Sequence, residues 1–256
     1  MDWRLVAWLA TLACLAIFNV VLWLWMARQA APRTRYAESQ LLLSAIYVGV
    51  CGVRSFFPRV DLERVCLWDT WLSAIVLGRT LATVAELCFA MQCGLFVQRL
   101  SDLTGIPLLS TVAQTFVPLA VVAEIACWYA VVSLDHIGHA IEETLWALIM
   151  LILATASGVA GLASDGGRAW LLLGGACVYA TGGVLTLAFD VTMYVRRRRA
   201  WANVERLPLA TGLRDCGVRR QPTRAWEVWR EEVAWMTLYF SIGVWTSLAM
   251  VLLERA

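Results

Sequence analysis

Apolar residues along this 256-residue chain gather in seven long runs, separated by short polar segments. A helical run of about twenty apolar residues is long enough to cross a lipid bilayer. The pattern predicts membrane-spanning helices, with ends defined to about two to four residues, at roughly 4–26, 40–56, 66–98, 112–134, 137–163, 169–195 and 227–253. We therefore expect an all-α, polytopic integral membrane protein that forms one domain (1–256), a bundle of seven transmembrane helices.

Composition narrows the classes of function that this chain can have. Hydrophobic residues make up 61% of it and charged residues 16%, whereas soluble domains contain about 25% charged residues. These values exclude a soluble enzyme, a nucleic-acid-binding module and a disulfide scaffold. All 21 basic residues are arginine. Because there is no lysine amine, the sequence also excludes a retinal Schiff base, a pyridoxal-phosphate aldimine and a phosphate-loop lysine.

The arginines predict the orientation of the chain. If seven spans are present, the amino terminus shares one side with the loops after the second, fourth and sixth spans. That side carries about 14 arginines and the opposite side about six. Cytoplasmic loops are enriched in Lys and Arg, so we expect a cytoplasmic amino terminus and an external carboxyl terminus in the cell (inner) membrane.

The segment 196–226 is the only sizeable loop that this pattern leaves outside the bilayer. It opens with four consecutive arginines, Arg196 to Arg199. Each arginine near an anionic membrane surface contributes about 1 kcal/mol of attraction. The loop is therefore expected to lie on anionic lipid headgroups, with docking of a protein partner as the alternative. No nucleic-acid partner is expected.

The third predicted span carries the densest set of intramembrane polar residues. Ionisable groups in hydrocarbon are costly, so each needs a partner, a cavity or a functional role. Arg79 and Glu86 share a helix face with Asp69 adjoining, but they are two turns, roughly 10 Å, apart. We therefore expect Arg79 to meet Glu124 of the fourth span rather than Glu86. The cluster is either a charge network that holds helices together or a substrate or ion site.

A second polar group opens the fifth span. It contains the only two histidines of the chain, His136 and His139, with Glu143 on the same helix face. Imidazole and carboxylate groups at this spacing can bind one divalent metal. A structural interpretation competes with this one. Asp135 can cap the helix amino terminus, the glutamates can face the helix dipole, and the segment can be an interfacial entry turn.

With this topology, several further polar residues share the cytoplasmic level, and they suggest a vestibule that leads to the buried charges. They are Arg54, Asp69, Asp190 and Glu231. The favoured function is a membrane-embedded enzyme that acts on a lipid-soluble substrate, with one divalent metal as its only implied cofactor. Asp69, Arg79, Glu86, Glu124 and Asp190 would be catalytic, whereas Arg54 and Glu231 would bind substrate, Arg54 by holding an anionic head group. The alternatives are a proton-coupled carrier that uses the intramembrane Arg and Glu residues, and a non-catalytic subunit or receptor.

Overall fold

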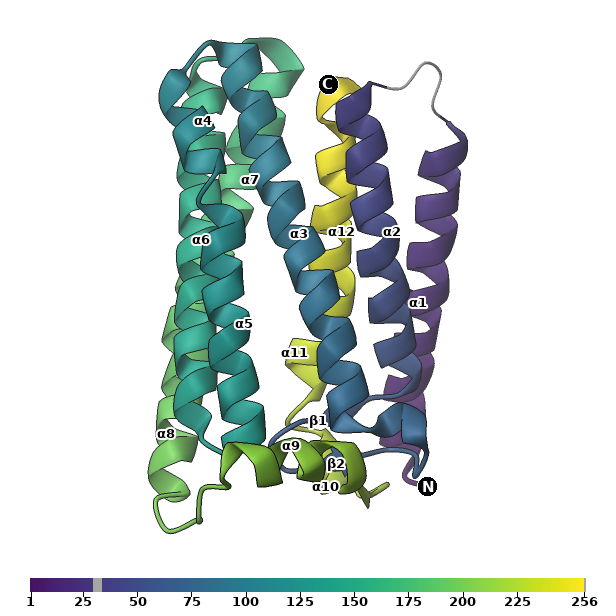
Figure 1. The fold of residues 1–256 in the computed structure, drawn as a ribbon. Helices are drawn as coiled ribbons and strands as arrows, with labels where there is room; N and C mark the ends of the chain where they lie inside the picture. Colours follow the sequence, from purple (N-terminus) through teal and green to yellow (C-terminus); the bar gives the residue numbers. More distant parts are fainter. Residues whose placement is uncertain (30–33, 256) are drawn as a thin grey trace. The chain divides into compact units, whose positions relative to one another are not determined.

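The computed structural model describes residues 1–29 and 34–255, and about 82% of the chain is helical, which confirms an all-α fold (Figure 1). Within these residues, seven helical segments are long and apolar enough to cross a membrane, as expected of a multi-pass membrane protein. Four are single helices: α1 (Trp3–Arg28), α2 (Arg35–Phe56), α3 (Ile75–Thr104) and α6 (His136–Leu162).

The other three membrane-length segments are composite. The fourth joins α4 (Pro107–Ala113) to α5 (Phe116–Ser133). The sixth runs from α7 (Gly166–Leu185) through the π-helix η2 (Thr186–Val191) into α8 (Thr192–Ala200). The seventh consists of α11 (Val233–Leu238), the π-helix η3 (Tyr239–Gly243), α12 (Val244–Ala249) and the 3-10 turn η4 (Met250–Arg255).

The predicted third span was wrong at its beginning. The chain first forms strand β2 (Val65–Cys66) and the 3-10 turn η1 (Trp71–Ser73), and α3 begins only at Ile75. Asp69 therefore lies in a loop, where its carboxylate pairs with Arg220 Nε at 3.0 Å. An apolar run alone does not distinguish a packed loop from the first turns of a helix, so the prediction placed Asp69 on the helix face.

The chain divides into two compact units, which we describe separately. Unit 1 comprises Met1–Phe89 and Leu213–Leu252, and unit 2 comprises Ala90–Gly212 and Leu253–Ala256. The organisation as a single domain stays a prediction.

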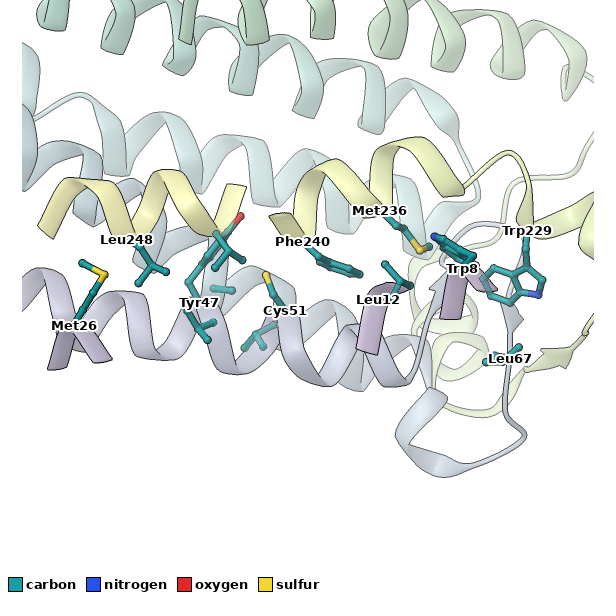
Figure 2. Close-up of a cluster of buried hydrophobic side chains, with 14 of the residues drawn as sticks. Trp8, Leu12, Met26, Tyr47, Cys51, Leu67, Trp229, Met236, Phe240 and Leu248 are labelled. Atoms are coloured by element: carbon teal, nitrogen blue, oxygen red, sulfur yellow. The ribbon is translucent and has the colours of Figure 1, made fainter. Parts of the chain in front are cut away.

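Unit 1 is built around an apolar core between α1, α2 and the seventh segment (Figure 2). Leu12 of α1, Tyr47 of α2 and Phe240 of η3 are among its buried members. Polar atoms inside this core have protein partners. Asn19 Nδ2 donates to the carbonyl of Phe240 at 2.7 Å, and Trp245 Nε1 donates to Asn19 Oδ1 at 3.0 Å. A π-helix interrupts the regular i→i+4 ladder, and Asn19 satisfies a carbonyl within that interruption.

A three-stranded sheet closes one end of unit 1. Strand β1 (Arg59–Val60) pairs antiparallel with β2, and β2 pairs parallel with β3 (Gln221–Pro222). Arg64 occupies the turn between β1 and β2 with a left-handed backbone, φ 59°. Its buried guanidinium donates to the Asp61 carbonyl at 2.6 Å and pairs with Asp215 at 2.8 Å. Arg64 therefore links this turn to α9 (Leu209–Val218).

Unit 2 places α5, α6 and α7 side by side (Figure 1). Helix α5 ends at Ser133, and the left-handed conformation of its C-cap Leu134 (φ 60°, ψ 37°) reverses the chain into α6. Asp135 caps α6, with its Oδ1 accepting from the Ile137 amide at 3.1 Å. Gly138 lets the two helices approach closely, because a Cβ there would lie 2.3 Å from the Ala126 carbonyl oxygen.

Candidate functional site

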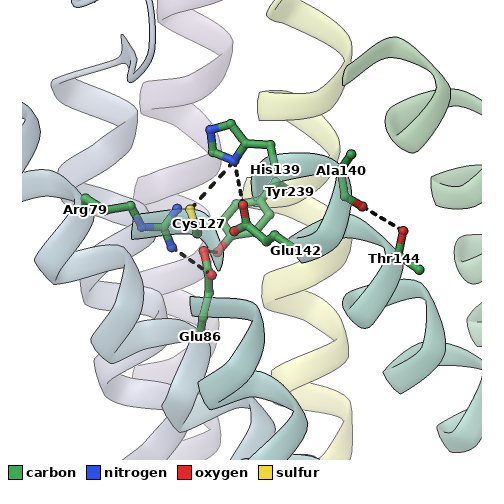
Figure 3. Close-up of polar contacts among 8 residues, drawn as sticks. All are labelled: Arg79, Glu86, Cys127, His139, Ala140, Glu142, Thr144 and Tyr239. Carbon is green, nitrogen blue, oxygen red and sulfur yellow. Dashed lines mark hydrogen bonds and ion pairs between the residues drawn. The ribbon is translucent and has the colours of Figure 1, made fainter. Parts of the chain in front are cut away.

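The first polar cluster lies in unit 1 and contains the Arg79–Glu86 pair of α3 (Figure 3). Arg79 Nη2 lies 2.9 Å from Glu86 Oε2, and both side chains are buried. The expectation that these residues are too far apart for direct pairing was therefore wrong. A separation of seven residues is about 10.5 Å along a helix axis, and these two long side chains extend toward each other and close that distance.

The seventh segment supplies a further partner for Glu86. Tyr239 OH donates to Glu86 Oε1 at 3.1 Å, so each oxygen of the carboxylate has a hydrogen-bond donor. No role for Tyr239 is predictable from the sequence, because its position opposite α3 depends on tertiary packing. Arg54, at the end of α2, lies over the same ring with its Cζ 5.4 Å from the centroid. This placement is a cation–π contact, which favours a partly desolvated guanidinium.

Arg59 of β1 is the remaining buried cation of this cluster. Its guanidinium occupies the space beside Gly78, where an added Cβ would lie 1.5 Å from Arg59 Cζ. Arg59 Nε pairs with Asp61 at 3.0 Å. Burial, together with the nearby charges of Arg54 and Arg79, lowers the pKa of Arg59 to about 10, and Asp61 acts in the opposite direction. Arg59 is therefore still protonated at neutral pH.

The second polar cluster lies in unit 2, and we call it the Cys–His–Glu centre: Cys127 of α5 with His139 and Glu142 of α6 (Figure 3). His139 Nδ1 lies 2.6 Å from Glu142 Oε2 and 3.8 Å from Cys127 Sγ. All three side chains are buried, and one ligand atom from each lies within 4.8 Å of the other two. These three atoms are close enough together to hold one metal ion.

Local structure explains why these residues meet. His139 and Glu142 are three residues apart, so they face the same side of α6. The close approach at Gly138 brings α5 against this face, and Cys127 follows Ala126, whose carbonyl faces Gly138. Glu124 lies one turn before Cys127 and is also buried. Oxygens of Glu124 and Glu142 lie within 4.8 Å of each other.

Of the three predicted metal ligands, only His139 belongs to the Cys–His–Glu centre. His136, one turn earlier, packs against the rings of Trp201 and Tyr194, with centroid distances of 4.7 and 6.1 Å. Glu143 lies on a partly exposed face of α6. Cys127 was missed because a buried thiol among eight cysteines resembles a small hydrophobic residue. The one indication of Cys127 in the sequence is its place in the helix before the pair His139 and Glu142.

The other predicted site residues lie apart from these two clusters. Asp190 is partly buried within η2 of unit 2. Glu231 is exposed in the turn before α11 of unit 1, and its neighbour Glu232 is the buried one, accepting a hydrogen bond from Trp235 Nε1. Asp69 is exposed and paired with Arg220, as described above. The expectation that Asp69 belongs to the buried polar face of α3 was therefore wrong.

No protein-family model, curated protein or solved structure matches this chain. Its function must therefore be argued from the geometry and chemistry of the two polar clusters.

The Arg79–Glu86 pair leads to a test of buried charge in unit 1. Removing one partner of a buried ion pair leaves the other uncompensated, which costs about 3–5 kcal/mol in soluble proteins. We expect Arg79→Leu or Glu86→Leu to lower the free energy of unfolding in detergent by a comparable amount. The double variant should lose much less than the sum, because no orphan charge remains. Strictly additive losses would contradict this coupling. Asp69→Asn, which removes a surface ion pair, is the matched control and should change stability by about 0–1 kcal/mol.

Proposed function

We propose that this protein is a membrane-embedded, metal-dependent enzyme whose Cys–His–Glu centre binds one divalent transition metal. The observation that carries the proposal is the convergence of Cys127, His139 and Glu142 in a buried position. Thiolate, imidazole and carboxylate groups together are typical ligands of zinc and related ions. We therefore keep the metal dependence expected from the sequence and propose a different ligand set.

The geometry of the Cys–His–Glu centre fits such an ion. Bond lengths of about 2.0–2.3 Å in a tetrahedral zinc site imply ligand atoms about 3.3–3.8 Å apart. The Cys127–His139 separation of 3.8 Å is already at that distance, and the His139–Glu142 contact of 2.6 Å is a hydrogen bond. Metal binding requires ligands to lose their protons. The ion would therefore take the place of the hydrogen bond between His139 Nδ1 and Glu142 Oε2, and the two side chains would separate slightly.

Electrostatics also favours a cation here. Glu124 and Glu142 are both buried, with carboxylate oxygens within 4.8 Å of each other. Two like charges this close, in a region of low dielectric, are unfavourable unless a proton or a cation compensates them. A divalent metal held by Glu142 would stabilise both carboxylates.

The arrangement supports hydrolysis, or polarisation of a carbonyl or phosphoryl group. Cys127, His139 and Glu142 would hold the metal, which would supply Lewis acidity to a water or substrate bound beside them. Glu124, whose carboxylate oxygen lies within 4.8 Å of Glu142, would act as the general base. The centre lies within helices of membrane-spanning length, so a lipid-soluble molecule is the substrate class that we propose.

The arginine distribution supports a cytoplasmic amino terminus and an external carboxyl terminus in the inner membrane. A reporter inserted near Gln221 should then be active inside the cell, and one fused after Ala256 should be active outside. The fusions can be compared by paired enzymatic reporters that work on opposite sides of the membrane. The reverse pattern would contradict the proposed orientation without affecting the metal centre.

The metal content of the purified full-length chain tests the central part of the proposal. After loading with zinc and removal of excess ion, elemental analysis should find about one equivalent per chain. We expect His139→Ala and Cys127→Ser to lose it, since each removes one of three protein ligands. His136→Ala is the matched control, because it removes the other histidine and should retain the metal.

Folding of each variant is checked by its thermal unfolding transition in the presence of a chelator. Folded His139→Ala and Cys127→Ser proteins that keep a full equivalent of zinc would refute the assigned ligands. The same conclusion would follow if the folded wild-type chain bound no metal.

A further inference from the structure

A separate cavity of about 280 Å³ lies at the end of unit 2 where α6 begins and α8 ends. Asp135 and His136 form the wall on the α6 side. Arg198 and Arg199 come from the end of α8, and Trp201 and Arg206 from the segment that follows. None of the three residues of the Cys–His–Glu centre lines this cavity.

The cavity carries an excess of positive charge. The buried carboxylate of Asp135 pairs with Arg198 Nε at 3.1 Å and with Arg206 Nη2 at 3.0 Å. Arg199 adds a third guanidinium to the lining. One carboxylate against three guanidinium groups leaves a formal surplus of two positive charges. Both arginines that pair with Asp135 have side chains about half exposed, so their remaining N–H groups can reach a ligand from solvent.

His136 is an independent sign of a ligand. Its side chain is 1% exposed, and neither ring nitrogen has a hydrogen-bond partner. Buried polar groups are nearly always hydrogen-bonded, and an unsatisfied one costs about 1–3 kcal/mol. Aromatic rings pack against the imidazole, with Trp201 in an edge-to-face contact at 4.7 Å. The ring therefore lines the cavity with both nitrogens shielded from solvent and without a hydrogen-bond partner.

We propose that this cavity binds a phosphate group. Guanidinium groups match phosphate oxygens in shape and charge, and one nitrogen of a neutral imidazole can donate to the same anion. The cavity lies at the end of α6, a helix of membrane-spanning length, and Trp201 is part of its lining. Trp side chains are enriched at the level of lipid headgroups in membrane proteins. A phospholipid headgroup and a free phosphate share this chemistry, and experiment separates them. This site goes beyond the metal centre and does not depend on it.

Two binding measurements on the full-length protein in detergent test the proposal. Native mass spectrometry compares phosphatidylglycerol with phosphatidylcholine, and calorimetry follows inorganic phosphate. Arg199→Gln and His136→Phe should each weaken binding about tenfold, because each removes a hydrogen bond to a charged group. Arg196→Gln is the matched control: it neutralises an exposed arginine of the same run on α8, outside the cavity lining. It should leave binding unchanged.

The pattern across ligands and variants decides the outcome. If Arg199→Gln and His136→Phe, but not Arg196→Gln, weaken binding of phosphatidylglycerol, the site binds a lipid headgroup. If the same two variants weaken binding of inorganic phosphate instead, the site binds a soluble phosphate. Equal weakening by all three variants would indicate diffuse surface charge and overturn the proposal, as would the absence of binding to either probe. Arg199→Lys, which keeps the charge of an exposed residue, should bind more strongly than Arg199→Gln. The His139→Ala variant should lose the metal and still bind phosphate normally. Loss of metal binding can therefore be distinguished from loss of phosphate binding.

Discussion

A polar side chain inside apolar helices loses its contact with water, and only another protein group or a bound ligand can compensate for that loss. The interiors of both units follow this constraint. In unit 1, Glu86 receives hydrogen bonds from Arg79 and Tyr239, and Asn19 satisfies the Phe240 carbonyl inside a π-helix. These contacts join α1, α3 and the seventh segment. The buried polar residues of this unit therefore determine which helices pack together as well as how they pack.

In unit 2 the same constraint applies to buried residues that can bind a metal. The contact between His139 and Glu142 satisfies one polar pair, but Glu124 places a second buried carboxylate nearby. The close approach of α5 and α6 at Gly138 adds the Cys127 thiol to this group. A divalent cation would neutralise the carboxylates and use all three kinds of ligand. The close approach that Gly138 permits thus brings these three side chains together.

Much of the helical architecture was predictable from the sequence, because membrane-length apolar runs are an unusually strong signal. The beginning of α3 was not, since Leu67 and Trp68 extend the apolar pattern through a packed loop. Among the site residues, Arg79, Glu86 and His139 could be identified from the cost of burying ionisable groups. The partners of these three residues could not be identified in this way. Tyr239 and Cys127 come from other helices, and their contacts depend on packing that no local pattern encodes.

X-ray absorption spectroscopy of the zinc-loaded protein tests the metal centre most directly, because it identifies the donor atoms themselves. We expect one sulfur at about 2.3 Å from zinc, with nitrogen and oxygen donors at about 2.0–2.2 Å. The sulfur contribution should vanish in Cys127→Ser. A wild-type spectrum with nitrogen and oxygen donors only, or a sulfur signal that survives Cys127→Ser, would contradict the assignment of Cys127, His139 and Glu142 as the metal ligands.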